Sequence, residues 1–266
     1  MGTERRRRFR GTLFVTTRER HEELTVAVTR LPDRGADGPA FVLVHGVGVS
    51  SRYFRPVAIR LAEHGSVHLV DLPGYGSAPN PRTHVSLADH ADTVAAFVRG
   101  LGGREVVLVG HSMGAQVVAT LAERHPQLAS ALVLMAPTIE PELRTTWRAI
   151  GALLRDIPRE PAVVSWIAFT DYLVRTGAPY LLRQLPLVLD DRLEERIARV
   201  SGSVLLLRGA DDVIVGRDWL ALLAERSGAT AVEVPGPHVV MYTDPDAVAA
   251  AIVLHARGEH PVGGPA

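Results

Sequence analysis

A serine lies between two glycines at residues 110–114, which read Gly-His-Ser-Met-Gly. The apolar run at 105–109 predicts a buried strand, and the alanine-rich stretch at 115–123 predicts a helix. A strand that turns directly into a helix crowds the turn, so a Cβ at either glycine is expected to clash. Ser112, at the apex of this turn, is therefore the first candidate nucleophile. The alternative is a serine that only caps the following helix.

A serine hydroxyl is a weak nucleophile at neutral pH, so it needs a base and an acid that orients the base. Residues 209–212 read Gly-Ala-Asp-Asp after an apolar run, and His238 follows the strand predicted at 230–234. Functional groups of parallel sheets gather at the carboxyl ends of the strands. We therefore expect His238 to be the base and either Asp211 or Asp212 to be the acid.

The attacked carbonyl also needs donors for the negative charge that develops on its oxygen. The sequence His-Gly-Val-Gly at 45–48 follows a strand-like run and can turn a backbone N–H toward the serine. Val47 is the expected donor, together with the N–H of Met113 at the start of the helix after the serine. An ordinary loop between a strand and a helix is the alternative interpretation of 45–48.

The composition of the 266-residue chain excludes several kinds of chemistry. All 29 basic residues are arginine and cysteine is absent, which excludes a Schiff-base lysine, a P-loop lysine, a cysteine nucleophile and a thiolate metal site. The 29 acidic residues balance the arginines, and zero net charge does not favour nucleic acid as a partner. Serine, histidine and carboxylates remain, and we expect a small-molecule substrate, no cofactor and no metal.

Apolar segments of strand length alternate with segments of helical period along most of the chain. This pattern predicts an α/β fold with a mostly parallel sheet of about eight strands and helices on both faces. The first two strands, at about 13–17 and 24–29, are expected to form an antiparallel pair. The core of the fold is expected to comprise residues 11–137 and 201–257.

Both ends of the chain are expected to be disordered, at residues 1–10 and 258–266. The arginines at 5–8 have no apolar segment after them, so the start lacks the pattern of a signal peptide. Anchoring to an anionic surface is the alternative to a solvated basic tail. No apolar run reaches the roughly 18 residues of a membrane span, and with the absence of cysteine this favours a cytoplasmic protein.

Residues 138–200 have helical periodicity but no strand pattern, which predicts an inserted helical cap. Prolines are expected to divide it into short helices, because each removes an N–H and disfavours helix at the preceding residue. A cluster of aromatic residues is consistent with an apolar roof over a pocket or with ordinary packing between cap and core. The prolines are 141, 158, 161, 179 and 186, and the aromatic residues are Trp147, Trp166, Phe169, Tyr172 and Tyr180.

Over about residues 24–257 the chain resembles the α/β-hydrolase superfamily, in particular its cap-bearing branch of esterases and C–C hydrolases. The resemblance implies the triad Ser112, Asp212 and His238, because the family's acid is usually the last residue of Gly-x-x-Asp. The motifs that carry the resemblance are His-Gly-x-Gly at 45–48, Asp-Leu-Pro-Gly-Tyr-Gly-Ser at 71–77, Gly-His-Ser-Met-Gly at 110–114, Gly-x-x-Asp at 209–212 and the late His238. The departures from the family pattern are Pro237 and Ala115, where glycine is common, and Gly216, where proline is usual.

The resemblance also narrows the reaction. A serine at position 112 argues against dehalogenases and epoxide hydrolases, for which the resemblance would require an aspartate. C–C hydrolases commonly have asparagine before the nucleophile, where this chain has His111, so an ester, thioester or lactone of a small to medium apolar substrate is favoured. His111 is expected to pack beside the turn rather than act as a second base. The alternatives are a C–C hydrolase or a cofactorless acyltransferase or perhydrolase on the same site, and a non-catalytic binding module of the same fold. The sequence does not indicate an oligomeric state.

Overall fold

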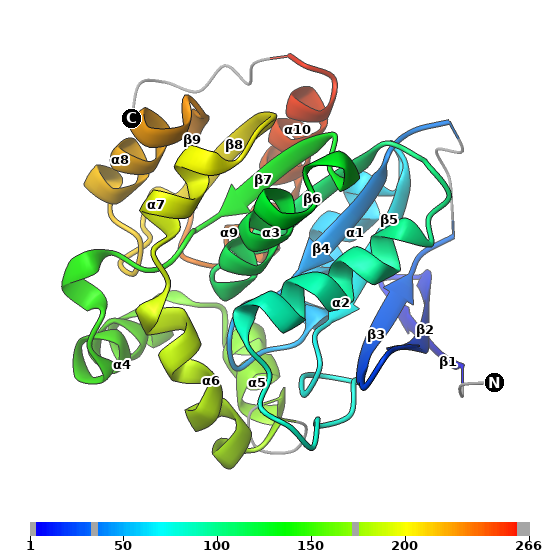
Figure 1. Ribbon diagram of the computed structural model, residues 1–266, viewed down its shortest axis with the longest axis horizontal. Helices are drawn as coiled ribbons and strands as arrows, with labels where there is room; N and C mark the ends of the chain where they lie inside the picture. The colour runs from blue at the N-terminus through cyan, green and yellow to red at the C-terminus, as the bar shows by residue number, and fades with distance from the viewer. Residues whose placement is uncertain (1–3, 33–36, 172–175, 260–266) are drawn as a thin grey trace.

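The computed structural model describes residues 4–32, 37–171 and 176–259. Its strands are β1 (Arg5–Phe9), β2 (Thr12–His21), β3 (Leu24–Arg30), β4 (Ala40–Val44), β5 (Ser66–Asp71), β6 (Val106–His111), β7 (Ala131–Met135), β8 (Ser203–Gly209) and β9 (Thr230–Val234). They form one sheet in the order β1-β2-β3-β5-β4-β6-β7-β8-β9 (Figure 1). The pairs β1/β2, β2/β3 and β3/β5 are antiparallel, and all other pairs are parallel. The predicted, mostly parallel α/β sheet is confirmed.

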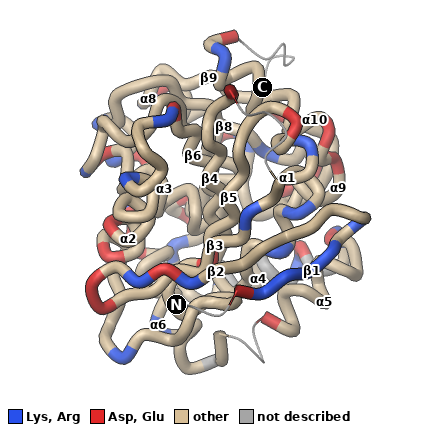
Figure 2. Tube along the Cα trace, turned by 90° about the vertical axis from the view of Figure 1, so that its right-hand side faces the viewer, with Lys and Arg blue, Asp and Glu red and all other residues tan. Residues whose placement is uncertain are grey.

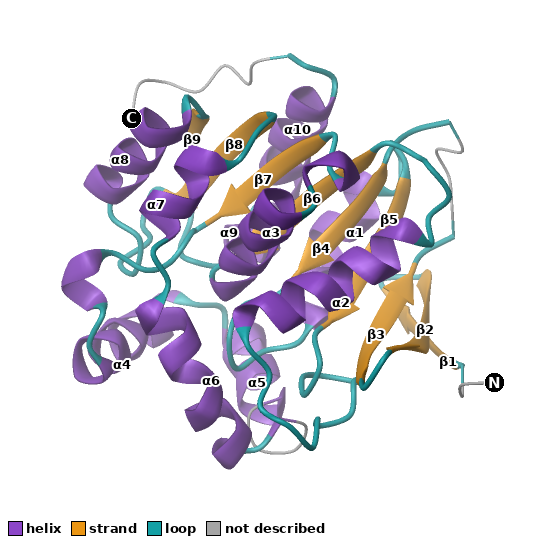
Figure 3. Ribbon diagram, in the orientation of Figure 1, coloured by secondary structure: helices purple, strands orange, loops and turns teal. Residues whose placement is uncertain are grey.

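Helices cover both faces of the sheet, and each layer has its own apolar core (Figure 3). One layer comprises α2 (Leu87–Arg99), α3 (Met113–Arg124), α7 (Leu193–Arg196) and α8 (Arg217–Ser227), and the other comprises α1 (Arg55–Leu61), α9 (Val240–Thr243) and α10 (Pro245–Ala256). The central strands β4, β6 and β7 are buried along their whole length, as expected for unbroken apolar runs between two helical layers. This rigid centre positions the loops at the carboxyl ends of the strands.

The arginine run near the start of the chain is an edge strand, which corrects the prediction of a disordered tail over residues 1–10. Residues Arg5–Phe9 pair with β2, and the rings of Phe9 and Phe14 pack edge to face with centroids 6.3 Å apart. Figure 2 shows basic residues along β1, which crosses the side of the molecule that faces the viewer. The hydrogen bonds of the hairpin explain the ninth strand, which the charge pattern concealed. Most of the predicted C-terminal tail, residues 260–266, lies outside the described residues.

Between β7 and β8 the described residues form helices and no strand. The principal ones are α4 (Thr146–Asp156), α5 (Ala162–Thr170) and α6 (Ala178–Asp190), which lie together beyond one end of the sheet (Figure 1). Prolines 141, 161 and 179 lie at the starts of helical segments. Pro186 lies inside α6, so the prediction that it divides the helix is wrong. Packing of buried neighbours such as Val188 and Leu189 outweighs the loss of one backbone hydrogen bond there.

The aromatic residues of this segment form no roof over a pocket within the described residues. The side chains of Trp147, Trp166 and Phe169 are 83%, 64% and 54% exposed, respectively. Tyr180 is buried, and its hydroxyl donates a hydrogen bond of 2.7 Å to the carbonyl of Pro73. Tyr180 therefore packs between the helical segment and the core, whereas Tyr172 lies outside the described residues.

Candidate active site

Ser112 lies at the junction of β6 and α3 with φ of 55° and ψ of −121°, a backbone conformation that non-glycine residues rarely adopt. A Cβ on Gly110 would lie 2.3 Å from the carbonyl oxygen of Gly114. A Cβ on Gly114 would lie 2.1 Å from the carbonyl oxygen of Val44. Both glycines are thus required by the close approach of backbone atoms, as the sequence predicts, and the strained turn presents the serine at its apex.

The structure brings Asp212 and His238 together from the ends of β8 and β9. The Nδ1 atom of His238 lies 2.8 Å from one carboxylate oxygen of Asp212. The other carboxylate oxygen accepts the N–H groups of Ile214 and Val215 at 2.8 and 3.0 Å, which fixes the orientation of the carboxylate. Asp211 is exposed, and its backbone N–H donates to the carbonyl oxygen of Gly236 in the loop after β9. Only Asp212 has the geometry of an acid that orients His238.

Arg208 fixes the turn that carries Asp212, and sequence reasoning missed it. Its buried guanidinium donates 2.9 Å hydrogen bonds to the carbonyl oxygens of both Asp212 and Val215. It also pairs with Glu233 on β9, which is positioned beside β8 in the sheet. Arg208 is the second-to-last residue of β8 and lies four residues before Asp212, so a buried-strand pattern interrupted by an arginine at this position is the signal in the sequence.

The ionisation of the pair follows from its burial and its mutual attraction. Burial acts to raise the pKa of Asp212, but the charge and hydrogen bond of His238 and two backbone N–H groups outweigh it and lower that pKa. Burial acts to lower the pKa of His238, but Asp212, with the nearby carboxyls of Asp156 and Glu160, raises it. The imidazolium that forms when His238 accepts a proton is therefore stabilised.

His111 is buried beside Ser112 and His238, in agreement with the expected packing role. Its ring lies 4.7 Å from that of His238, and its Nε2 lies 3.1 Å from the backbone oxygen of His238. Its Nδ1 lies 2.9 Å from the hydroxyl of Tyr53. Burial and the charge of His238 hold the pKa of His111 well below its usual value, so this ring is neutral. A neutral, doubly hydrogen-bonded ring positions its neighbours.

Two carboxyl groups from the helical segment lie close to His238, and the sequence gave no indication of them. Glu160 accepts the N–H of Val239 at 3.0 Å, and its carboxyl also contacts that of Asp156. One oxygen of each, Asp156 Oδ1 and Glu160 Oε2, is buried without a hydrogen-bond partner. Burial and the charge of Asp156 raise the pKa of Glu160 to about 8, and burial raises that of Asp156. The two groups are therefore arranged to share one proton.

The expected oxyanion donors lie on either side of Ser112. Met113 is the first residue of α3, so its N–H has no acceptor within the helix. Val47 lines the same pocket as Ser112. A Cβ on Gly46 would lie 3.0 Å from the Cβ of Ser112, so the loop after β4 approaches the serine closely. The backbone of the loop after β4 and the start of α3 thus both lie next to Ser112.

The pocket at Ser112 is almost entirely aliphatic. Ser112 and Thr138 contribute its polar side chains, and no charged residue lines it within the described part of the chain. The residues that line it are Val47, Ser112, Thr138, Ile139, Leu143, Ala152, Leu185, Val188, Leu189 and Ile214. Several of them belong to α4 and α6, so the helical segment forms one wall of the pocket. Such a pocket binds apolar groups by excluding water.

A buried ion pair holds α5 to the loop that follows Val47. The carboxylate of Asp171, which is fully buried, accepts hydrogen bonds from both the N–H and the hydroxyl of Ser50. Arg52 donates to the same carboxylate at 2.7 Å and to the hydroxyl of Thr170 at 2.6 Å. These contacts fix the helical segment relative to the proposed oxyanion loop.

No group of three or more histidine, aspartate or glutamate side chains is placed to hold a metal ion within the described residues. No helix in that part of the chain is long and apolar enough to cross a membrane.

Comparison with known proteins places the fold and the motifs in a family. The sequence model of the Alpha/beta hydrolase family matches residues 41–251. The chain is 36% identical over 107 residues to 2-(acetamidomethylene)succinate hydrolase of Mesorhizobium japonicum, which covers 40% of this chain and 38% of that protein. It is 33% identical over 140 residues to pimeloyl-[acyl-carrier protein] methyl ester esterase of Vibrio cholerae, which covers 52% and 48%. The matched regions thus span less than half the length of these two relatives.

The likeness in structure extends over nearly the whole chain. The crystal structure of E-2-(acetamidomethylene)succinate hydrolase superposes with a TM-score of 0.78 and 25% sequence identity. The superposition covers 92% of this chain and 99% of that one. Because the superposition covers 92% of this chain, it includes most of the helical segment between β7 and β8, which the family model also spans.

Proposed function

Because the chain belongs to the alpha/beta hydrolase family, we propose that it is a serine hydrolase that cleaves a carboxylic ester, thioester or lactone through an acyl-enzyme on Ser112. The observation that carries the proposal is the 2.8 Å hydrogen bond between His238 and Asp212. These two residues and Ser112 all follow the carboxyl ends of parallel strands. A histidine oriented by a buried carboxylate is what a serine nucleophile requires.

In the proposed first step, His238 takes the hydroxyl proton of Ser112 while the serine oxygen attacks the carbonyl carbon. The backbone N–H groups of Val47 and Met113 donate to the developing oxyanion. Collapse of the tetrahedral intermediate breaks the bond to the leaving oxygen or sulfur, which takes the proton from His238. Water then attacks the acyl-enzyme with the same histidine as base, and the free acid leaves. Asp212 stabilises the imidazolium in both steps.

The lining of the pocket supports an uncharged, aliphatic acyl group. Its walls are leucine, isoleucine, valine and alanine side chains, and none of the described residues in the lining is an arginine or a histidine. A succinate carries carboxylates, and a buried carboxylate without a cationic partner is costly. We therefore propose that the substrate bound here differs in charge from the one named for the relative in Mesorhizobium.

We further propose that residues 138–200 act as a cap that selects this group. The pocket wall includes Leu185, Val188 and Leu189 of α6, and Asp171 anchors the segment to the loop of Val47 through Ser50. Enlarging the pocket on the α6 side, for example by Leu185→Ala, is therefore expected to shift the preferred acyl chain to a longer one.

The test is hydrolysis of a series of p-nitrophenyl esters of increasing acyl length, with Ser112→Ala as the control. We expect turnover with an optimum in chain length, none by Ser112→Ala, and poor turnover of dicarboxylate half-esters. Product analysis with added alcohol or peroxide separates hydrolysis from acyl transfer or perhydrolysis. Turnover that persists in Ser112→Ala would contradict the proposed nucleophile, and no turnover of any ester would contradict the substrate class.

A further inference from the structure

A second hollow lies away from the Ser112 pocket, beside the outer strand β1, which contains the arginines at 5–8. One of its walls follows from strand register. Arg5 pairs with Thr16, Thr16 with Thr29, and Thr29 with Leu69, so these four side chains form one row on the same face of the sheet. Arg7 lies two residues beyond Arg5 and so points to the same face. All five residues line the hollow.

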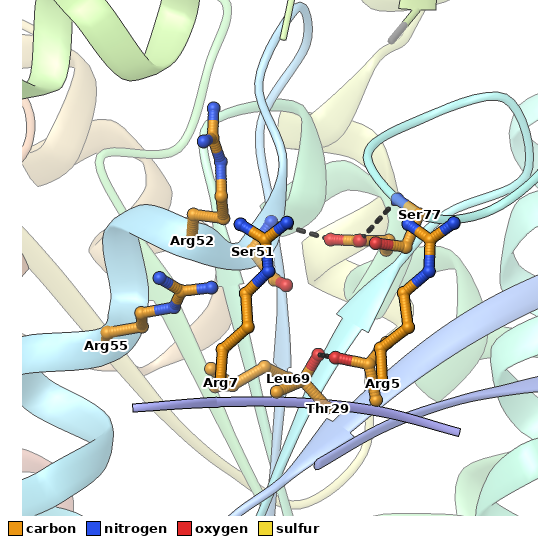
Figure 4. A pocket seen from close by; sticks show the side chains of 10 residues that line it. Arg5, Arg7, Thr29, Ser51, Arg52, Arg55, Leu69 and Ser77 are labelled. Carbon is orange, nitrogen blue, oxygen red and sulfur yellow. Dashed lines mark hydrogen bonds between the residues drawn. The ribbon is translucent and has the colours of Figure 1, made fainter. Parts of the chain in front are cut away.

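The opposite wall comes from the segment that follows the proposed oxyanion loop. Arg52 belongs to a short 3-10 helix (Ser51–Phe54), and Arg55 is the first residue of α1. The guanidinium of Arg55 lies over the rings of Phe14 and Phe9, 5.5 and 5.9 Å from their centroids. This stacking holds Arg55 against the hairpin. Figure 4 shows the four arginines around one opening, two from each wall.

The lining of this hollow contains four arginines and a single carboxylate. The one carboxylate in its lining is Asp71, whose oxygens accept the N–H groups of Ser51 and Ser77 at 2.8 Å each. Arg52 pairs with the buried Asp171. Within the described residues, Arg5 and Arg7 have no carboxylate within ion-pairing distance. Four guanidinium groups therefore line a hollow whose one carboxylate already accepts two backbone N–H groups.

Protection of the sheet edge does not explain this arrangement. Charged residues on an edge strand oppose pairing with another chain, and Arg6 and Arg8 on the other face meet that need. Those two also have local partners, since Arg6 pairs with Glu4 and Arg8 donates to the carbonyl of Gly11. Edge protection does not require that Arg5 and Arg7 converge with arginines from a different element. Binding of an anion between the two walls does require this convergence.

We propose that this hollow is a binding site for a phosphate group carrying more than one negative charge, such as a pyrophosphate or a phosphate monoester. Guanidinium groups bind phosphate oxygens through paired N–H donors, and the site supplies them from both walls. The hydroxyl groups of Ser51 and Ser77 lie in the same lining and add neutral donors, and the hydroxyls of Thr16 and Thr29, which are hydrogen-bonded to each other at 2.7 Å, add one more. The site shares no lining residue with the Ser112 pocket, so it stands independently of the proposed hydrolysis.

The strand itself provides the matched variants. Arg5→Ala/Arg7→Ala removes two charges from the site, and Arg6→Ala/Arg8→Ala removes the same number of charges from the opposite face of β1. Titration calorimetry with sodium pyrophosphate at constant ionic strength measures binding to each. We expect saturable binding by the native chain, at least about 10-fold weaker binding by the first variant, and a change within about 2-fold for the second. Unchanged thermal unfolding and ester turnover establish that both variants are folded.

Equal weakening in the two variants would overturn the proposal, because it indicates attraction by net charge alone. Absence of saturable pyrophosphate binding by the native chain overturns it as well, if the chain also fails to bind vesicles that contain phosphatidic acid. Sedimentation with phosphatidylcholine vesicles that contain phosphatidic acid, but not with pure phosphatidylcholine, identifies a lipid headgroup as the source of the phosphate. That sedimentation must be lost in Arg5→Ala/Arg7→Ala and kept in Arg6→Ala/Arg8→Ala. Pyrophosphate binding without sedimentation identifies a soluble ligand.

Discussion

The Nε2 atom of His111 lies 3.1 Å from the backbone oxygen of His238. A carbonyl oxygen only accepts, so Nε2 carries the proton, and the Nδ1 of the neutral ring must accept. The hydroxyl of Tyr53, 2.9 Å from Nδ1, therefore donates to His111 and accepts the N–H of Gly46 at 2.9 Å. These three consecutive hydrogen bonds connect the loop of His238, the proposed base, to the loop of Val47, the proposed oxyanion donor.

Replacement of Tyr53 by phenylalanine is expected to remove the two hydrogen bonds that the Tyr53 hydroxyl makes in this series. It leaves the Gly46 N–H and His111 Nδ1 buried without partners, which costs about 1–3 kcal/mol of stability. It should also lower kcat more than it changes KM, because both loops move relative to Ser112. Urea unfolding and ester kinetics measure the two effects. Tyr242→Phe, at a partly exposed tyrosine, is the control, and equal behaviour of the two variants would refute the link.

Asp212→Asn tests the assignment of the acid. The amide cannot stabilise the imidazolium and favours the wrong tautomer of His238, so we expect kcat to fall about 10⁴-fold, the scale known for such a change in another serine hydrolase. Asp211→Asn, at the adjacent exposed residue, should retain nearly full activity. Steady-state kinetics of the two folded variants decides the assignment, and a larger loss in Asp211→Asn would reverse it.

The pH profile should reflect the carboxyls near His238. Since the pKa of His238 is raised, kcat/KM should begin to fall, as the pH is lowered, above the ordinary histidine value of 6.5. Asp156→Asn/Glu160→Gln removes the negative charge that the carboxyl pair places near His238, so the acid limb should move to lower pH. Asp190→Asn, on an exposed aspartate at the end of α6, should leave it in place. An unmoved limb in Asp156→Asn/Glu160→Gln would show that these carboxyls do not act on His238.

Glu160 makes a separate prediction about stability. Its pKa in the folded chain is about 8, against an ordinary value of 4.5, so the folded state holds a proton that the unfolded state has lost. The stability from this proton is complete below pH 4.5 and is lost as the pH rises through 8. Glu160→Gln, which cannot ionise, should therefore lose less stability than the native chain between these values. Urea unfolding across the range measures the difference, and parallel curves would contradict the raised pKa.

The parts of the site that depend on backbone geometry could be predicted from the sequence. Gly110, Ser112 and Gly114 specify a turn by themselves. Asp212 and His238 follow the carboxyl ends of two neighbouring parallel strands, which brings them together. Whether these residues act as proposed stays a prediction. Glu160 could not be found in this way, because it lies in a helical segment whose position depends on tertiary contacts such as that of Asp171 with Ser50.

The arginine strand was mispredicted for a related physical reason. Four consecutive arginines have neither the alternation of a half-buried strand nor the apolar run of a buried one. Their strand structure depends on pairing with β2 and on the contact of Phe9 with Phe14, which are not local features. The sequence cannot predict the convergence of Arg5 and Arg7 with Arg52 and Arg55 for the same reason. Only the register of β1 with β2 places Arg5 and Arg7 on the face where the other two lie.

The most direct test of the account is labelling with a fluorophosphonate followed by peptide mapping. The reagent forms a covalent bond to a serine only when a base activates its hydroxyl. We predict stoichiometric labelling at Ser112, none in Ser112→Ala, and strongly slowed labelling in His238→Ala, with all three chains folded. Labelling at another serine, or an unlabelled native chain, would contradict the claim that Ser112 is a nucleophile activated by His238 and Asp212.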